Sequence, residues 1–263
     1  MKYIIDAHSH IFPSKIATKA TAAIGSFYGI DMDMPGSVES LLQYKMIDKT
    51  VVCSSATTMH QVSAINDFIF SECKANNKLV GLATLSPDMN KAMAREELKR
   101  LEDYDVHGFK FHPDFQNYSF DDINVYPLYE LICEKGLPIM VHAGDKRYSR
   151  SNPNTISKVA RDLPDLKICA AHFGGYSEWD KLSEYEGLEN VWFDTCSSLP
   201  FIAPEVAKGF IDKFGAHRFM FGSDFPMWRP DEEIERFEKL DLTAAEKEMI
   251  YYKNAIDFYK IEI

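Results

Sequence analysis

Two histidines, His8 and His10, lie at the end of the first apolar run of the chain, residues 3–10. Side chains at positions i and i+2 of a β-strand point to the same face, so Asp6, His8 and His10 are expected to share one side. Two imidazoles held side by side on a rigid strand suit a divalent metal, which needs preset nitrogen donors. Ordinary surface or core histidines can also show this spacing, so the later motifs have to decide between the two interpretations.

More ionisable side chains stand at or near the ends of later apolar runs. They are Lys110 and His112 in residues 107–112, His142 after 137–141, His172 after 166–171, Asp194 in 191–195, and Asp224 after 219–223. Imidazole and carboxylate donors without a thiolate favour zinc, manganese, iron or nickel over a soft metal. Such an ion with an open position activates water and polarises a carbonyl or phosphoryl oxygen.

The elements that would carry these side chains form a regular series. Short apolar runs are predicted to be strands at residues 3–10, 50–54, 79–85, 107–112, 137–142, 166–172, 191–195 and 219–223. Amphipathic stretches between them predict helices at residues 39–46, 62–75, 89–101, 125–134, 154–163, 176–185, 204–214, 231–240 and 243–259. We read residues 14–35 as a helix and a loop over one end of the fold.

Alternating strands and helices in a chain of 263 residues predict the α/β class, as a single-domain (β/α)8 TIM barrel over residues 1–263. A doubly wound open sheet is the alternative. In a (β/α)8 barrel the C-terminal strand ends form the catalytic face, and the ionisable side chains gather there. That clustering favours a metal site over scattered structural histidines.

Composition restricts the partners. The net charge is −11, which argues against unspecific binding to nucleic acid or to anionic membranes. Five cysteines without a paired CxxC spacing indicate reduced thiols and a cytoplasmic protein. No signal peptide and no apolar run of membrane-spanning length are recognised in the sequence.

The motifs, taken in chain order, resemble the amidohydrolase superfamily. The HxH pair, GFKFHP, PIMVHAG, AHFGG and FGSDFP are similar to the amidohydrolase-related branch, which includes the aminocarboxymuconate-semialdehyde decarboxylase group. The resemblance implies that one metal is held by four ligands: His8, His10, His142 and Asp224. It implies that His172 is a second-metal ligand or an acid/base, and that Asp224 takes a proton from the attacking water. It also implies a homodimer.

Lys110 leaves two alternatives open. The resemblance allows a carboxylated lysine that bridges two metals, or a cation beside a single metal that pairs with a substrate carboxylate or an inward aspartate. We expect one metal and an uncarboxylated Lys110. Arg147 and Tyr148, in the loop after His142, and Trp228 after Asp224 are further candidates for substrate binding, Arg147 as a bidentate carboxylate clamp. A solvated loop arginine is the alternative for Arg147.

The leading expectation for function is a metal-dependent hydrolase that uses a metal-activated water on a small carboxylated amide, lactone or ester. Asp224 and His172 would move the protons, and zinc is the expected metal. The alternative is a non-oxidative decarboxylase of an unsaturated or aromatic acid on the same metal site, in which His172 protonates carbon. Asp194 is expected to support a ligating histidine or to cap a strand. Cys196 is expected to be a buried thiol.

Overall fold

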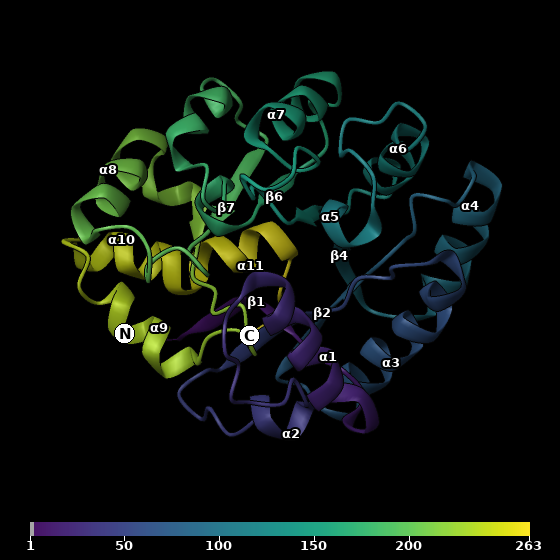
Figure 1. Cartoon of the computed structure of the whole chain (residues 1–263), viewed down its shortest axis with the longest axis horizontal. Coiled ribbons are helices and arrows are strands. Elements are labelled where there is room, and N and C mark those ends of the chain that lie inside the picture. Colours follow the sequence, from purple (N-terminus) through teal and green to yellow (C-terminus); the bar gives the residue numbers. More distant parts are fainter. Residues whose placement is uncertain (1–2) are drawn as a thin grey trace.

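The computed structural model describes residues 3–263 and contains one sheet of eight parallel strands in the order β1 to β8 (Figure 1). The strands are β1 (Ile5–His10), β2 (Lys49–Cys53), β3 (Leu79–Ala83), β4 (Val106–Phe111), β5 (Ile139–Val141), β6 (Ile168–Ala170), β7 (Val191–Asp194) and β8 (Phe219–Met220). Strand order that follows chain order is the (β/α)8 arrangement and rules out the doubly wound alternative, in which the order reverses. The predicted barrel is therefore confirmed.

The seam between β8 and β1 closes the barrel through single hydrogen bonds. The amide of Ala7 donates to the carbonyl of Phe221 over 2.8 Å, and the amide of His10 donates to the carbonyl of Phe225 over 2.6 Å. Between them, the amide of Asp224 donates to the carbonyl of His8 over 2.8 Å. The seam thus places two predicted metal ligands, His8 and Asp224, next to each other.

Helices surround the sheet (Figure 1). The α-helices are α1 (Ser14–Tyr28), α2 (Val38–Leu41), α3 (Val62–Ala75), α4 (Lys91–Arg100), α5 (Pro113–Gln116), α6 (Tyr126–Glu134), α7 (Pro153–Asp162), α8 (Pro204–Phe214), α9 (Pro230–Phe237), α10 (Ala244–Glu248) and α11 (Asn254–Tyr259). Shorter 3₁₀ turns and one π-helix lie at η1 (Met59–Gln61), η2 (Leu101–Asp103), η3 (His172–Gly174), η4 (Trp179–Tyr185), η5 (Ala216–Arg218) and η6 (Met249–Lys253). The capping box of Thr243 and Glu246 opens α10 as predicted.

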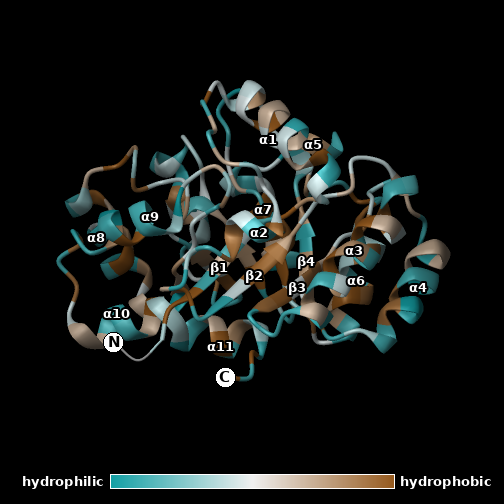
Figure 2. Cartoon of the chain, turned by 90° about the horizontal axis from the view of Figure 1, so that it is seen from below, coloured by the Kyte–Doolittle hydropathy of each residue, from teal (hydrophilic) through white to brown (hydrophobic). Residues whose placement is uncertain are grey.

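The helix expected in residues 14–35 is α1, and it lies over one end of the barrel. Figure 2 shows α1 and α5 on this side of the strands and α11 on the opposite side. Gly29 ends α1 in the left-handed conformation, with φ of 67°, which a residue without Cβ adopts at little cost. In this position α1 covers the strand ends that carry the ionisable side chains.

Two predicted helices are shorter than the sequence pattern suggests. The helix expected at residues 39–46 ends after one turn, since α2 covers only Val38–Leu41. The helix expected at residues 176–185 begins only at Trp179 and is a 3₁₀ helix. Tyr176 is extended instead, because its amide donates to the carbonyl of Ala143 over 2.7 Å and its carbonyl accepts from the amide of Asp145 over 2.8 Å. Because the amide and carbonyl of Tyr176 are already bonded to the segment after β5, they cannot form the hydrogen bonds of a helix.

The core lies inside the barrel and between strands and helices. Every residue of β3, β5 and β6 is buried, as expected for strands covered on both faces. No helix in residues 3–263 is long and apolar enough to cross a membrane, and none of the five cysteines is in a disulfide in that range.

Candidate metal centre and active site

Three predicted ligands lie together at the C-terminal end of β1 and beyond β8. The Nε2 atoms of His8 and His10 are 3.1 Å apart. Oδ1 of Asp224 is 3.2 Å from Nε2 of His10 and 3.7 Å from Nε2 of His8. Ligand atoms about 2.1 Å from a tetrahedral ion are about 3.4 Å from one another, so this spacing fits a divalent metal.

His142, the fourth predicted ligand, lies beside the same group but faces a different neighbour. Its Nδ1 is 2.9 Å from Nε2 of His172, and His172 stacks on His8 with ring centroids 5.5 Å apart. Nε2 of His142 is buried, has no hydrogen-bond partner among residues 3–263, and lies 3.7 Å from Oδ2 of Asp114. An unpartnered buried nitrogen beside two imidazoles is the kind of donor that a metal would satisfy. The spacing of His8, His10 and Asp224 therefore fits the implied ion, and ligation by His142 stays a prediction.

Asp194, at the end of β7, holds two of these histidines in place. Its Oδ2 accepts a hydrogen bond from Nδ1 of His8 over 2.8 Å, and its Oδ1 accepts one from the backbone amide of His172 over 2.7 Å. A carboxylate on one ring nitrogen directs the other ring nitrogen toward the metal position. The structure thus places Asp194 behind His8, a predicted ligand, in line with the first of the two roles expected for it.

The backbones of His172 and Asp224 are in the left-handed region, with φ of 61° and 59°. For residues with a Cβ this conformation costs about 1–3 kcal/mol and persists only where the surroundings enforce it. The amide of His172 is held by Asp194, and its carbonyl accepts from Nε1 of Trp179 over 3.0 Å. Both residues predicted to move protons therefore have constrained main chains.

Two buried carboxylates, Asp194 and Asp224, are ionised beside the histidine rings of the site. Burial opposes ionisation of Asp224, but the hydrogen bond from His10 and the charges of His8 and His172 outweigh it and hold the pKa of its carboxyl well below its usual range. Burial likewise opposes ionisation of Asp194, and the charge of His8 overcomes it and lowers the pKa of Asp194 to about 2. Burial lowers the pKa of the His8, His142 and His172 rings.

His10 behaves differently from the other rings. Burial lowers its pKa, but the neighbouring Cys53 and Asp224 outweigh burial and raise the pKa of His10 to about 9. In the metal-free protein this ring therefore carries a proton at neutral pH. A metal that binds Nε2 of His10 has to displace that proton.

Lys110, on β4, reaches the same position as the implied metal. Its side chain is fully buried, and its Nζ lies 2.8 Å from Nε2 of His8. A nitrogen that accepts from an ammonium cannot at the same time ligate an ion with the same lone pair. Metal binding to His8 therefore requires Lys110 to give up this contact.

A cavity of about 170 Å³ opens above this group. The polar groups at its base are His10, Lys110, His112, His142, His172 and Asp224, and its walls include Phe12, Ala20, Ile24, Tyr28, Met32, Phe115, Pro226 and Met227. Lys110 is the only lysine or arginine among the described residues that line it. The arrangement combines an acid–base cluster with walls that suit a small, flat, apolar ring.

Tyr28, the last residue of α1, is a part of the site that the sequence did not single out. Its hydroxyl lies 3.1 Å from Nε2 of His112, and its ring centroid is 6.1 Å from that of His142. His112 in turn stacks on His142, with centroids 4.1 Å apart. An amphipathic helix gives no signal that its final tyrosine points into a catalytic cavity, so only the fold could reveal it.

The other three candidates for substrate binding lie outside the residues that line this cavity. Arg147 donates to both carboxylate oxygens of Asp145 and, over 2.6 Å, to the carbonyl of Phe27. Tyr148 stacks on Phe27, with centroids 5.6 Å apart. These contacts favour a role for Arg147 in fastening α1 rather than in clamping a substrate in this cavity.

Trp228, the third candidate outside the cavity lining, acts on the site through a serine. Its Nε1 donates to Oγ of Ser197 over 3.1 Å, and Ser197 donates to Oδ2 of Asp224 over 2.5 Å. This chain fixes the carboxylate oxygen that faces away from the histidines. Contact of Trp228, Arg147 or Tyr148 with a substrate stays a prediction.

Asp6 was expected on the same face as the two histidines, and the structure gives it another task. Its carboxylate accepts from the amide and the hydroxyl of Ser223, over 2.9 and 2.5 Å, and from the hydroxyl of Ser9 over 2.9 Å. The register of β1 against β2 shifts between Asp6 and Ser9, which breaks the simple two-residue alternation. Asp6 therefore fastens the seam between β1 and the segment after β8.

Among solved structures, several share this architecture at low sequence identity. 5-Carboxyvanillate decarboxylase LigW from Sphingomonas paucimobilis aligns with a TM-score of 0.77 and 16% identity over 100% of both chains. An uncharacterized TIM-barrel protein, Bb4693 from Bordetella bronchiseptica, gives 0.79 and 19% over 97% of this chain and 98% of its own. Dihydroxybenzoic acid decarboxylase from Polaromonas sp. JS666, with bound manganese and 2-nitroresorcinol, gives 0.74 and 15% over 99% and 97%.

No curated protein matches the sequence. The family model described as Amidohydrolase, in contrast, matches residues 5–261, nearly the whole chain. The match includes β1 with its two histidines and the segment after β8 with Asp224. The fold, the order of the motifs and this match agree, and the chain belongs to the amidohydrolase family.

Proposed function

We propose that this protein is a metal-dependent non-oxidative decarboxylase of a small aromatic or unsaturated monocarboxylic acid. The observation that carries the proposal is the cavity, in which aromatic and aliphatic walls surround a base of histidines, one aspartate and one lysine. A single buried cation matches one carboxylate. Similar folds that are decarboxylases of aromatic acids support the same choice.

The residues of the chain have distinct tasks in this reaction. The walls hold the ring, and Lys110 pairs with the carboxylate. A divalent ion held by His8, His10, His142 and Asp224 would supply Lewis-acid polarisation of a substrate oxygen. As the bond between ring and carboxylate breaks, carbon dioxide leaves and the electron pair stays on the ring carbon. His172, after taking up a proton, gives it to that carbon.

Hydrolysis of a small carboxylated lactone, amide or ester is the second candidate. One feature favours it: despite burial, the hydrogen bond from His10 holds the pKa of Asp224 well below its usual range, and burial lowers the pKa of His142 and His172. Such groups accept protons from a water molecule more readily than they donate them. Asp224 would be the base that takes the proton, as the resemblance implies.

Product analysis separates the two reactions. Metal-loaded protein is incubated with hydroxybenzoates and muconates, and in parallel with carboxylated lactones, and both carbon dioxide and acid are measured. We expect carbon dioxide in a one-to-one ratio with the decarboxylated product, and none from protein treated with a chelator. Acid release from the lactones without carbon dioxide would replace the first proposal by the second, and inactivity toward both panels would overturn both.

We further propose that one ion is bound, zinc or manganese. Imidazole-rich sites suit zinc, whereas the Polaromonas decarboxylase binds manganese. Elemental analysis of protein purified without added metal would identify the ion and its stoichiometry. A cytoplasmic location and a homodimer remain predictions, which cell fractionation and light scattering after gel filtration would test.

A further inference from the structure

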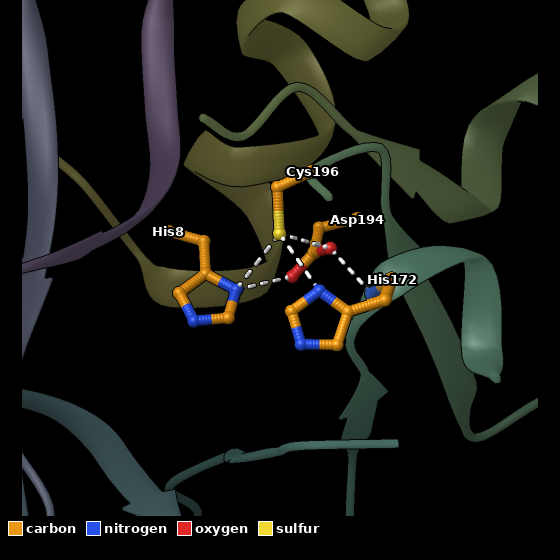
Figure 3. Close-up of side chains that lie close together, drawn as sticks. All are labelled: His8, His172, Asp194 and Cys196. Atoms are coloured by element: carbon orange, nitrogen blue, oxygen red, sulfur yellow. Dashed lines mark hydrogen bonds and ion pairs between the residues drawn. The ribbon is translucent and has the colours of Figure 1, made fainter. Parts of the chain in front are cut away.

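Cys196, just after β7, lies between Asp194 and two imidazoles (Figure 3). Its Sγ is 3.0 Å from Oδ1 of Asp194 and 3.2 Å from Nδ1 of both His8 and His172. All four residues are buried. The sequence suggested an inert buried thiol here, and the proposed reaction does not use it.

The protons in this cluster can be assigned by counting donors and acceptors. Asp194 is an anion and can only accept, and it already accepts from Nδ1 of His8 over 2.8 Å. The thiol has a single proton, and the carboxylate oxygen is the strongest acceptor within its reach. The S–H group therefore donates to Asp194, and the sulfur lone pairs remain free to accept.

The remaining donor for the sulfur is His172. The Nδ1 proton of His8 is already committed to Asp194, whereas Nδ1 of His172 lies 3.2 Å from Sγ of Cys196, whose backbone also bonds this ring. On the other side of the ring, Nε2 of His172 faces Nδ1 of His142 over 2.9 Å. A proton on Nδ1 of His172 thus satisfies the sulfur and leaves a lone pair on Nε2.

We propose that Cys196 is a positioning residue that fixes His172 as the Nδ1–H tautomer through the chain Asp194–Cys196–His172. The lone pair of His172 then lies on Nε2, the nitrogen that faces Nδ1 of His142 over 2.9 Å. One carboxylate in this way orients two imidazoles, His8 directly and His172 through the thiol. The role is the same whether the ring donates a proton to carbon or accepts one from water.

An ion held by the four residues of Figure 3 is the competing interpretation, since their ligand atoms all lie within 4.8 Å of one another. That ion would take Nδ1 of both histidines and a thiolate. The protons of His8 and His172 would then move to Nε2, so His8 could no longer ligate an ion on the cavity side. The two interpretations therefore predict opposite tautomers.

Nitrogen NMR of the metal-free protein, labelled with ¹⁵N-histidine, reads the tautomer without any substrate. We expect a protonated Nδ1 and an unprotonated Nε2 for His172 in the wild type and in Cys196→Ser, whose hydroxyl can donate and accept in the same way. In Cys196→Ala the preference should weaken, because only the backbone of residue 196 then remains beside the ring. The matched control is Cys169→Ala, because Cys169 is equally buried and its Sγ lies 3.9 Å from Oδ2 of Asp194.

Turnover provides a second measurement, and this arm alone rests on the proposed function. Removing a group that orients an active-site histidine costs about 10- to 100-fold, so we expect kcat of Cys196→Ala to fall by that factor with little change in KM. Serine should restore most of the loss, and Cys169→Ala should behave like the wild type.

The NMR, cobalt and turnover measurements distinguish the tautomer proposal, the competing ion site and the proposed function from one another. A wild-type His172 with its proton on Nε2, or an unchanged tautomer in Cys196→Ala, would overturn the proposal. If Cys196→Ala does not fold, the wild-type and serine spectra still decide the tautomer. A cobalt-loaded protein with a sulfur-to-metal charge-transfer band that Cys196→Ser abolishes would establish the competing ion site. Absence of turnover together with the expected tautomers would reject only the proposed function.

Discussion

Asp224 takes part in the seam through its backbone amide, and its side chain is a predicted metal ligand and proton acceptor. Its backbone has a φ of 59°, a conformation that asparagine tolerates better than other uncharged residues with a Cβ do. Asp224→Asn therefore keeps the main chain and one ligand oxygen but removes the base. We expect metal content to stay near the wild-type level and turnover to fall by about 10²- to 10⁴-fold. Elemental analysis and steady-state kinetics check this, and a metal-loaded Asn variant with most of its activity would contradict it.

Lys110 makes a prediction about metal affinity. Its ammonium contacts Nε2 of His8, the same atom that would hold the ion. Lys110→Met removes both the contact and the repulsion between two cations, so we expect metal to bind at least about tenfold more tightly, roughly 1.4 kcal/mol. Competition with a chromophoric chelator measures the affinity.

The control for this variant is Lys49→Met, since the Lys49 ammonium bonds the carbonyl of Asn77, outside the candidate site. It should leave metal affinity unchanged. Weaker metal binding in Lys110→Met, or two equivalents of metal in the wild type, would show instead that Lys110 is a bridging ligand.

At the scale of elements, α1 is held over the cavity by one arginine. Arg147 bonds Asp145 and the carbonyl of Phe27, and its guanidinium lies 4.7 Å from the centre of the Phe27 ring. Lysine has the charge but not the planar fork. We expect Arg147→Lys to raise KM by about 3- to 10-fold and to speed proteolysis within α1, with metal content unchanged. Equal rates of cleavage in variant and wild type would refute the fastening role.

The elements that could be predicted were those in which apolar residues follow a clear pattern along the chain. The barrel strands are short apolar runs, and the strand ends that bear His8, His10, His142, His172 and Asp224 could be recognised because a polar group stands out there. Tyr176 could not be predicted, because its extended backbone depends on Ala143 and Asp145, more than thirty residues away. The shift in register of β1 that redirects Asp6 depends on tertiary structure in the same way.

The whole molecule should be more stable with its metal than without it. The predicted ligands His8 and Asp224 belong to the first strand and to the segment after the last strand, so an ion would link the two edges at the seam. A ligand at 1,000 times its Kd stabilises the native state by about 4 kcal/mol. At about 2–4 °C per kcal/mol, we expect chelation to lower Tm by about 8–16 °C. Calorimetry with and without chelator measures this, and an unchanged Tm would place the ion elsewhere.

The buried carboxyl of Glu233, in α9, should make the free energy of unfolding depend on pH. It is fully buried, Oε1 accepts from Arg236 over 2.6 Å, and Oε2 has no partner in the described part of the chain. Burial raises the pKa of Glu233 from 4.5 to about 8. The folded state therefore holds this proton more tightly than the unfolded state, and the free energy of unfolding should fall as pH rises from about 5 to 8.

Glu233→Gln removes this titration. Relative to the variant, the metal-free wild type should lose about 1–4 kcal/mol between pH 5 and 8, since each pH unit in this window is worth up to about 1.4 kcal/mol. Urea denaturation at both pH values measures the difference. Glu232→Gln, a half-exposed neighbour, serves as the control. Parallel pH profiles of the wild type and Glu233→Gln would exclude the buried carboxyl as the cause.

The hydrogen bond from the Asp224 amide to the His8 carbonyl joins residues from the two ends of the sheet. During synthesis on the ribosome, His8 and His10 emerge long before Asp224 has been translated. Cation loading at the predicted site would therefore have to wait until the segment after β8 has left the exit tunnel. Nascent chains arrested before Asp224 would then be unable to acquire the ion, however much of it the cell contains.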